Sequence, residues 1–316
     1  SRALQGLISV CRTMDIQKDP YVLKLKAEPQ SSWKLRKLLL SGKTYCAEQL
    51  NKFYSKSRHI YDELGQWAAD YFIAESIRKL QKMVDTNEEI SFGLENDEKA
   101  YLLGILTQLP RTELGSDLRT VDNPQISTKV DSLISFLAKE ENGKFSGLIF
   151  VRQRATVSVM SKLLSIHPKT RGRFRCAPYV GLSNSANRKQ NIGELLDPHD
   201  QCETLDNFRQ GRTNLIIATD VLEGIDVTAC HLVICFDKPP NLKSFIQRRG
   251  RARQEMSTFA IMLADDDVSA SLNSWQALEE EMLRVYQNDA RLLQEVSNLE
   301  SIQEDVEDEF RVESTG

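Results

Sequence analysis

Two short apolar segments restrict the fold of this chain most strongly. The first is NLIIAT at residues 214–219, and the second is HLVICFD at 231–237. A short apolar run bounded by polar residues is typical of a parallel strand that is covered on both faces. Ligands bind outside the carboxyl ends of such strands, so we expect functional residues to follow these segments.

Charged residues cluster after both segments. Carboxylates follow the first one, and the second leads into SFIQRRGRARQ at 244–254, which holds four arginines within six positions. Guanidinium groups this close repel one another unless a polyanion, such as a triphosphate or a nucleic-acid backbone, neutralises them. The alternative interpretation is that Asp220 and Asp226 are loop carboxylates that pair with these arginines, and that the basic run is a solvated surface.

Four motifs resemble those of superfamily 2 helicases, which are ATP-driven enzymes built from two RecA-like domains. ATDVLEGIDV at 218–227 resembles motif V, and QRRGRAR at 247–253 resembles motif VI. SGLIFVRQR at 146–154 resembles motif IV, and TLDNFRQG at 204–211 resembles the segment that leads into motif V. The stretch from TYCAEQ to DYFI at 44–73 is similar to the helical insertion of fungal Dicer-like proteins, especially the Dicer-like protein 2 group.

The expected fold is α/β: a RecA-like doubly wound parallel sheet with an inserted all-α helical bundle and a C-terminal helical arm. Apolar residues recur at three- and four-residue steps between 46 and 72, which predicts a long helix with a bend at Gly65. From residue 148, strand and helix patterns alternate, which indicates a parallel sheet. We expect an insertion bundle over 1–115, the second RecA-like domain over 116–268, and the start of a pincer-like arm over 269–316.

The resemblance implies roles for individual residues. Arg251 and Arg253 are the predicted arginine fingers, assisted by Gln247. Many relatives place their second finger at the position of Gln254, so Arg251 is the stronger candidate. The predicted cofactor-binding residues are Asp226, which would reach the ribose, with Gly224 and Arg248. The predicted RNA-binding residues are Thr219, Arg154, Lys52 and Lys56.

The chain lacks some parts that the resemblance requires. It has no DExD/H motif, and SGKT at 41–44 is not a P-loop, because Lys37 stands where a P-loop has glycine. ATP and Mg²⁺ are therefore expected to be held mainly by a first RecA-like domain outside this chain, which alone would be inactive. No ribonuclease III signature is present either, and we expect the chain to be part of a longer protein.

The charge distribution agrees with an anionic partner. The net charge is −4, yet residues 147–254 hold 17 basic and 9 acidic residues, whereas residues 255–316 hold 3 and 16. The six cysteines show no CxxC pair, so we expect buried thiols and no metal site. No apolar run is long enough to cross a membrane, and we expect an intracellular, cytoplasmic protein.

The expected function is that of the C-terminal half of the ATP-dependent helicase module of a Dicer-like endoribonuclease, which cuts double-stranded RNA in RNA silencing and antiviral defence. Its expected partners are dsRNA and the first RecA-like domain. Two alternatives stay open: a viral-RNA sensing helicase without nuclease, and a non-catalytic docking platform for a dsRNA-binding cofactor protein.

Overall fold

The computed structural model describes residues 1–86, 96–109, 124–140, 145–181, 192–196 and 203–263, together with single helical residues between 277 and 288. The chain divides into two compact units. The first unit contains Ser1–Lys238 and Arg248–Met262, and the second contains Pro239–Gln247 and Leu263–Gly316. Each unit is described by itself.

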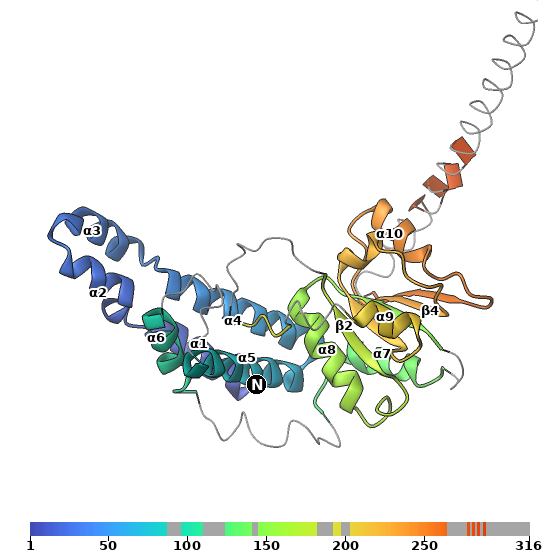
Figure 1. The fold of residues 1–316 in the computed structure, drawn as a ribbon, viewed down its shortest axis with the longest axis horizontal. Helices are drawn as coiled ribbons and strands as arrows, with labels where there is room; N and C mark the ends of the chain where they lie inside the picture. The colour runs from blue at the N-terminus through green and yellow to red at the C-terminus, as the bar shows by residue number, and fades with distance from the viewer. Residues whose placement is uncertain are drawn as a thin grey trace, which may run out of the picture. The chain divides into compact units, whose positions relative to one another are not determined.

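Helices form the N-terminal part of the first unit, as predicted (Figure 1). Side-chain caps fix several helix starts. Asp19 accepts from Tyr21 N at the start of α2, and Thr44 accepts from Ala47 N at the start of α4. The helices are α1 (Arg2–Thr13), α2 (Pro20–Ala27), α3 (Ser32–Ser41), α4 (Tyr45–Leu64), α5 (Gln66–Thr86) and α6 (Asn96–Leu106), with short 3₁₀ turns at Ile16–Lys18 and Pro29–Ser31.

The single bent helix predicted around Gly65 is in fact two helices. Gly65 has φ of +100°, a left-handed conformation that ends α4, and α5 begins at the next residue. The two helices then pack against each other (Figure 1). The centroids of the Phe53 and Phe72 rings lie 5.6 Å apart. A Cβ atom on Gly65 would also lie 2.6 Å from main-chain atoms of Ile126 and Ser127. Both the positive φ and this close approach therefore require glycine here.

A parallel five-stranded sheet follows, and it confirms the predicted α/β fold. The strand order is β2-β3-β1-β4-β5, and every pair is parallel. The strands are β1 (Gly147–Phe150), β2 (Cys176–Tyr179), β3 (Leu215–Ala218), β4 (Leu232–Cys235) and β5 (Thr258–Ile261). The helices are α7 (Thr128–Leu137), α8 (Arg154–Ile166), α9 (Thr204–Arg209) and α10 (Leu242–Arg249), with a 3₁₀ turn, η4, at Asp220–Gly224.

Alternate residues of the central strand β1 enter two different cores. Ile149 belongs to a large apolar core that includes residues of the helical bundle, α7 and α8. Leu148 and Phe150 belong to a second core with Phe208 of α9. Each face of the sheet is therefore covered, which is why its strands read as almost unbroken apolar runs.

The second unit is described only in part. In α10, Asn241 Oδ1 accepts a hydrogen bond from Ser244 N at 2.9 Å. The described residues between 277 and 288 are helical, in agreement with the helix expected there. The remainder of the predicted arm and both domain boundaries lie outside the described residues, so these boundaries stay predictions.

Candidate functional site

The carboxyl ends of β1, β2 and β3 lie together and bring two predicted motif segments to one edge of the sheet. Val151 N donates to Ala218 O at 2.9 Å, which keeps the ends of β1 and β3 level. Gly181, just beyond β2, has φ of +72°, and a Cβ atom there would lie 2.3 Å from Val221 Cγ1. The motif IV segment after β1 and the motif V segment after β3 therefore lie at one edge of the sheet.

Thr219 lies at the end of β3 and is 3% exposed. Its hydroxyl oxygen is buried and has no hydrogen-bond partner among the described residues. Gly224 and Asp226 are both exposed in the same segment, and a Cβ atom on Gly224 would meet nothing within 4 Å. The main-chain oxygen of Asp226 accepts from Arg209 Nη2 at 3.0 Å. The predicted ligand roles of these residues are not tested by these contacts and stay predictions.

A buried ion pair joins the segments predicted as motif V and motif VI. Glu223 Oε1 accepts from Arg248 Nε at 2.7 Å, and the side chains are 9% and 4% exposed, respectively. The Arg248 guanidinium also lies 4.8 Å from the centroid of the Phe150 ring, within cation–π range. The open alternative from the sequence was that Asp220 and Asp226 pair with the arginines, whereas the partner of Arg248 is Glu223.

Arg251 contacts the same residue from the segment after α10. Its Nη2 donates to the main-chain oxygen of Glu223 at 2.5 Å, and its own main-chain oxygen accepts from Cys230 N at 2.9 Å. Burial raises the pKa of the Cys230 thiol to about 12, and the nearby Arg251 charge partly opposes this rise. The hydrogen bond to Glu223 O therefore fixes the guanidinium end of Arg251, while the residue as a whole stays partly exposed.

The other predicted motif VI residues differ in surroundings. Arg253 is exposed, and its Nε donates to the main-chain oxygen of Gly250 in its own turn. Gln247 is half-buried within α10 and belongs to the second unit. Of the motif VI arginines predicted to act on the nucleotide, Arg251 combines a defined position with partial exposure, whereas Arg248 is buried.

A cavity of about 230 Å³ brings the predicted RNA-binding residues of two segments together. Lys56 of α4 and Arg154 of α8 both line it. Arg154 Nη1 donates to Val180 O at 3.3 Å, which fixes the guanidinium beside the end of β2. Lys52 is exposed one helical turn before Lys56, on the same face of α4. The sequence predicted these residues singly, but only the fold places Lys56 and Arg154 at one cavity.

The described residues contain no group of three or more His, Cys, Asp or Glu side chains placed to hold a metal ion. None of the helices described is both long and apolar enough to cross a membrane. The guanidinium donors at the edge suit anionic phosphate oxygens, whereas they cannot ligate Mg²⁺.

The chain is similar to a helicase family and to fungal Dicer-like proteins. The family model described as "Helicase conserved C-terminal domain" matches residues 128–254. Dicer-like protein 2 of Neosartorya fischeri and of Aspergillus fumigatus are each 52% identical to the chain over 316 residues, and Dicer-like protein 2-1 of Aspergillus niger is 50% identical over 317 residues. Each alignment includes 100% of this chain, which spans 23% of the length of each relative.

A solved structure, the C-terminal domain of the DEAD-box protein Dbp5, aligns with 52% of this chain and 82% of its own length, at 24% identity and a TM-score of 0.37. The matched helicase model covers α7, the strands β1 to β4, and the segments predicted as motifs IV to VI. Together with the matches to Dicer-like proteins along the whole chain, it supports a Dicer-like helicase C-terminal region.

Proposed function

We propose that this chain supplies motifs IV to VI of the ATP-dependent helicase module of a Dicer-like enzyme that cuts double-stranded RNA in RNA silencing and antiviral defence. The observation that carries the proposal is the joining of motif V to motif VI by Glu223, which bonds Arg248 through its carboxylate and Arg251 through its main-chain oxygen. This arrangement fixes the guanidinium of Arg251, a partly exposed residue, against the buried Glu223.

Arg251 is the proposed arginine finger. A guanidinium has five N–H donors, and one hydrogen bond to Glu223 O positions the group without using them all. When ATP and Mg²⁺ are bound by the first RecA-like domain, they supply the phosphoryl group and the metal charge. Arg251 would stabilise the negative charge that develops on the phosphoryl oxygens. In this proposal Arg248 supports Arg251 through Glu223, and Gln247, Arg253, Gly224 and Asp226 keep their predicted nucleotide roles.

RNA is proposed to contact a different part of the edge. Lys56 and Arg154 line one cavity, and Lys52 extends the same basic face of α4. Cationic side chains that contact the phosphates of dsRNA bind it without sequence preference. Thr219, with a buried hydroxyl that lacks a partner among the described residues, is proposed to bond a phosphate after a local shift of η4.

A second candidate function is favoured by the exposed apolar residues of α2 and α3. These residues are Tyr21, Leu23, Trp33 and Leu40, which are 42%, 52%, 63% and 81% exposed. Exposed lysines such as Lys34 and Lys37 lie among them. We infer that an acidic, apolar segment of a dsRNA-binding cofactor protein docks there. The alternative of a viral-RNA sensor without nuclease has no such observation in its favour, whereas the relatives named above are Dicer-like proteins.

Binding of dsRNA by the 316-residue chain tests the RNA side of the proposal. We expect affinity to fall by about tenfold or more between about 50 and 200 mM salt, because several phosphate contacts release counterions. A double variant, Lys56→Ala with Arg154→Ala, should bind several-fold more weakly. Lys162→Ala, on the same helix as Arg154 but not lining the cavity, is the control. Affinity that is unaffected by salt, or by the double variant, would contradict the assignment.

A further inference from the structure

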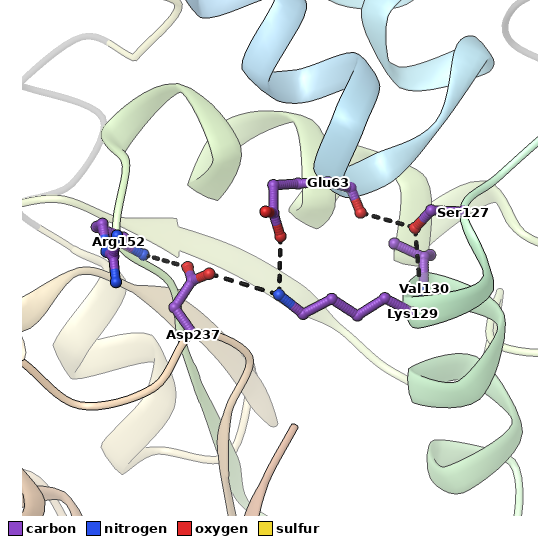
Figure 2. Close-up of polar contacts among 6 residues, drawn as sticks. All are labelled: Glu63, Ser127, Lys129, Val130, Arg152 and Asp237. Atoms are coloured by element: carbon purple, nitrogen blue, oxygen red, sulfur yellow. Dashed lines mark hydrogen bonds and ion pairs between the residues drawn. The ribbon is translucent and has the colours of Figure 1, made fainter. Parts of the chain in front are cut away.

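Ser127 forms hydrogen bonds at the end of α4 and at the start of α7. Its N–H donates to Leu64 O at 3.0 Å, and its hydroxyl donates to Glu63 O at 2.6 Å, both at the end of α4. The same hydroxyl accepts from Val130 N at 3.2 Å and so caps α7 (Figure 2). The insertion bundle and the first helix of the helicase region therefore meet through hydrogen bonds from Ser127 to main-chain oxygens of α4.

Lys129, two residues further along, lies between two carboxylates. Its Nζ is 2.7 Å from Glu63 Oε2 and 3.6 Å from Asp237 Oδ1 (Figure 2). It also lies 4.1 Å from the centroid of the Phe236 ring. The side chains of Lys129, Glu63 and Asp237 are 27%, 29% and 16% exposed. Such a partly buried network couples its members more strongly than an isolated surface ion pair does.

Helix stability alone does not explain these two charges. Lys129 is in the first turn of α7, next to the positive end of the helix dipole. Glu63 is in the last turn of α4, next to the negative end. Each charge is therefore at the end of its helix where it is least favoured. The contact between them stabilises both, which points to a role in joining the two helices.

Asp237 extends this network to the centre of the sheet. Its Oδ2 accepts from Arg152 N at 2.6 Å, so it connects the ends of β4 and β1 (Figure 2). The strand order reverses between these two strands, and open parallel sheets commonly bind ligands at that point. In this chain, the hydrogen bond between Arg152 N and Asp237 lies at that point of the sheet. Arg152 lies two residues before Arg154, which lines the proposed RNA cavity.

We propose that Lys129 is a positioning residue that couples RNA bound at the insertion bundle to ATP turnover. Lys56, at the cavity, and Glu63 belong to the same helix, α4. A displacement of α4 by RNA is thus transmitted through Glu63 and Lys129 to Asp237. Asp237 precedes the chain segment that leads into motif VI. This inference rests on the proposed function, because it concerns the link between its two ligands.

Substitution of Lys129 in the full-length protein tests the inference. For Lys129→Met we expect the dsRNA concentration for half-maximal ATPase stimulation to rise about three- to tenfold, while the RNA-free rate and the KM for ATP change less than about twofold. Lys129→Arg should restore coupling, since a guanidinium can also bridge two carboxylates. Lys169→Met is the matched control. Lys169 forms an exposed ion pair of 3.9 Å with Asp131, which lies on α7 as Lys129 does.

Two outcomes would overturn the inference. One is an unchanged RNA dependence for Lys129→Met. The other is an equal loss of RNA-free and RNA-stimulated turnover, which would indicate a purely structural role.

Hydrogen exchange of the Arg152 amide in the 316-residue chain gives a readout that needs neither ATP nor RNA. We expect faster exchange in Lys129→Met than in the unsubstituted chain, because Asp237 loses its second partner, and unchanged exchange would also refute the positioning role. If the unsubstituted full-length protein shows no RNA-stimulated turnover, the proposed function fails, whereas the exchange result still decides whether Lys129 holds Asp237.

Discussion

Removal of Arg248 should destabilise the chain far more than removal of an exposed arginine. In Arg248→Ala, the Glu223 carboxylate would remain with only 9% of its side chain exposed and without its ion-pair partner. Breaking a buried pair from one side costs about 3–5 kcal/mol. The substitution also removes the guanidinium that lies 4.8 Å from the Phe150 ring centroid. We therefore expect the urea midpoint of unfolding to fall by about 1–2 M.

Urea denaturation followed by circular dichroism measures this loss. Arg58→Ala is the matched control, since Arg58 pairs with Asp62 at 2.9 Å while their side chains are 55% and 49% exposed, and we expect no resolvable shift of the midpoint. The double variant Arg248→Met with Glu223→Leu should recover at least half of the lost free energy, because no unpaired charge remains buried. A loss below about 1 kcal/mol in Arg248→Ala, or a double variant as unstable as the single one, would refute the reasoning.

Three further predictions concern Gly65, the thiols of two buried cysteines, and Thr219. Gly65→Ala should lower the free energy of unfolding by about 2 kcal/mol or more in thermal or urea unfolding. Gly42 is also at positive φ but has open space around it, so Gly42→Ala should lower that free energy by about 1 kcal/mol. Equal losses would contradict the close approach at Gly65. Burial raises the pKa of the Cys235 thiol to about 11 and that of the Cys230 thiol to about 12, compared with an ordinary pKa of 9.0. The folded state therefore retains protons that the same thiols release when the chain is unfolded. Unfolding free energy should therefore fall between about pH 9 and pH 11 in urea titrations, and a rise over that range would contradict the burial of these thiols. Thr219→Ala in the full-length protein should raise the dsRNA concentration needed to stimulate ATP turnover, as measured by titration with RNA; an unchanged value would remove Thr219 from the RNA contact.

The strands were predictable because their pattern is local. The runs at 214–219 and 231–237 contain β3 and β4, and burial on both faces leaves few polar residues inside them. The corner at Gly65 was only partly predictable. The apolar stripe continues from α4 into α5, because both helices bury a face in the same core, so the pattern indicated one helix. Gly65 adopts its positive φ where the chain approaches residues 126–127, which are distant in sequence.

The partners of the charged residues were not predictable from the sequence. Three carboxylates follow β3, and spacing does not distinguish among Asp220, Glu223 and Asp226 as partners of Arg248. The choice depends on η4, whose turn buries Glu223 and leaves Asp220 exposed. Lys129 has one partner 66 residues before it and another far after it, so only the assembled fold brings the three together. The shared position of Lys56 and Arg154 at one cavity depends on tertiary structure in the same way.

In the proposed function, motif VI acts on the nucleotide, whereas the basic cavity acts on RNA. ATP turnover and dsRNA affinity, measured in parallel on the full-length protein with Arg251→Ala, test this division. We expect turnover to fall by about 10³-fold and RNA affinity to change less than about threefold, since a finger acts in the transition state whereas RNA is held by many contacts. Arg251→Lys should not restore turnover, because an ammonium group lacks the planar fork. Normal turnover combined with lost RNA binding in Arg251→Ala would contradict the claim and would place motif VI against the nucleic acid.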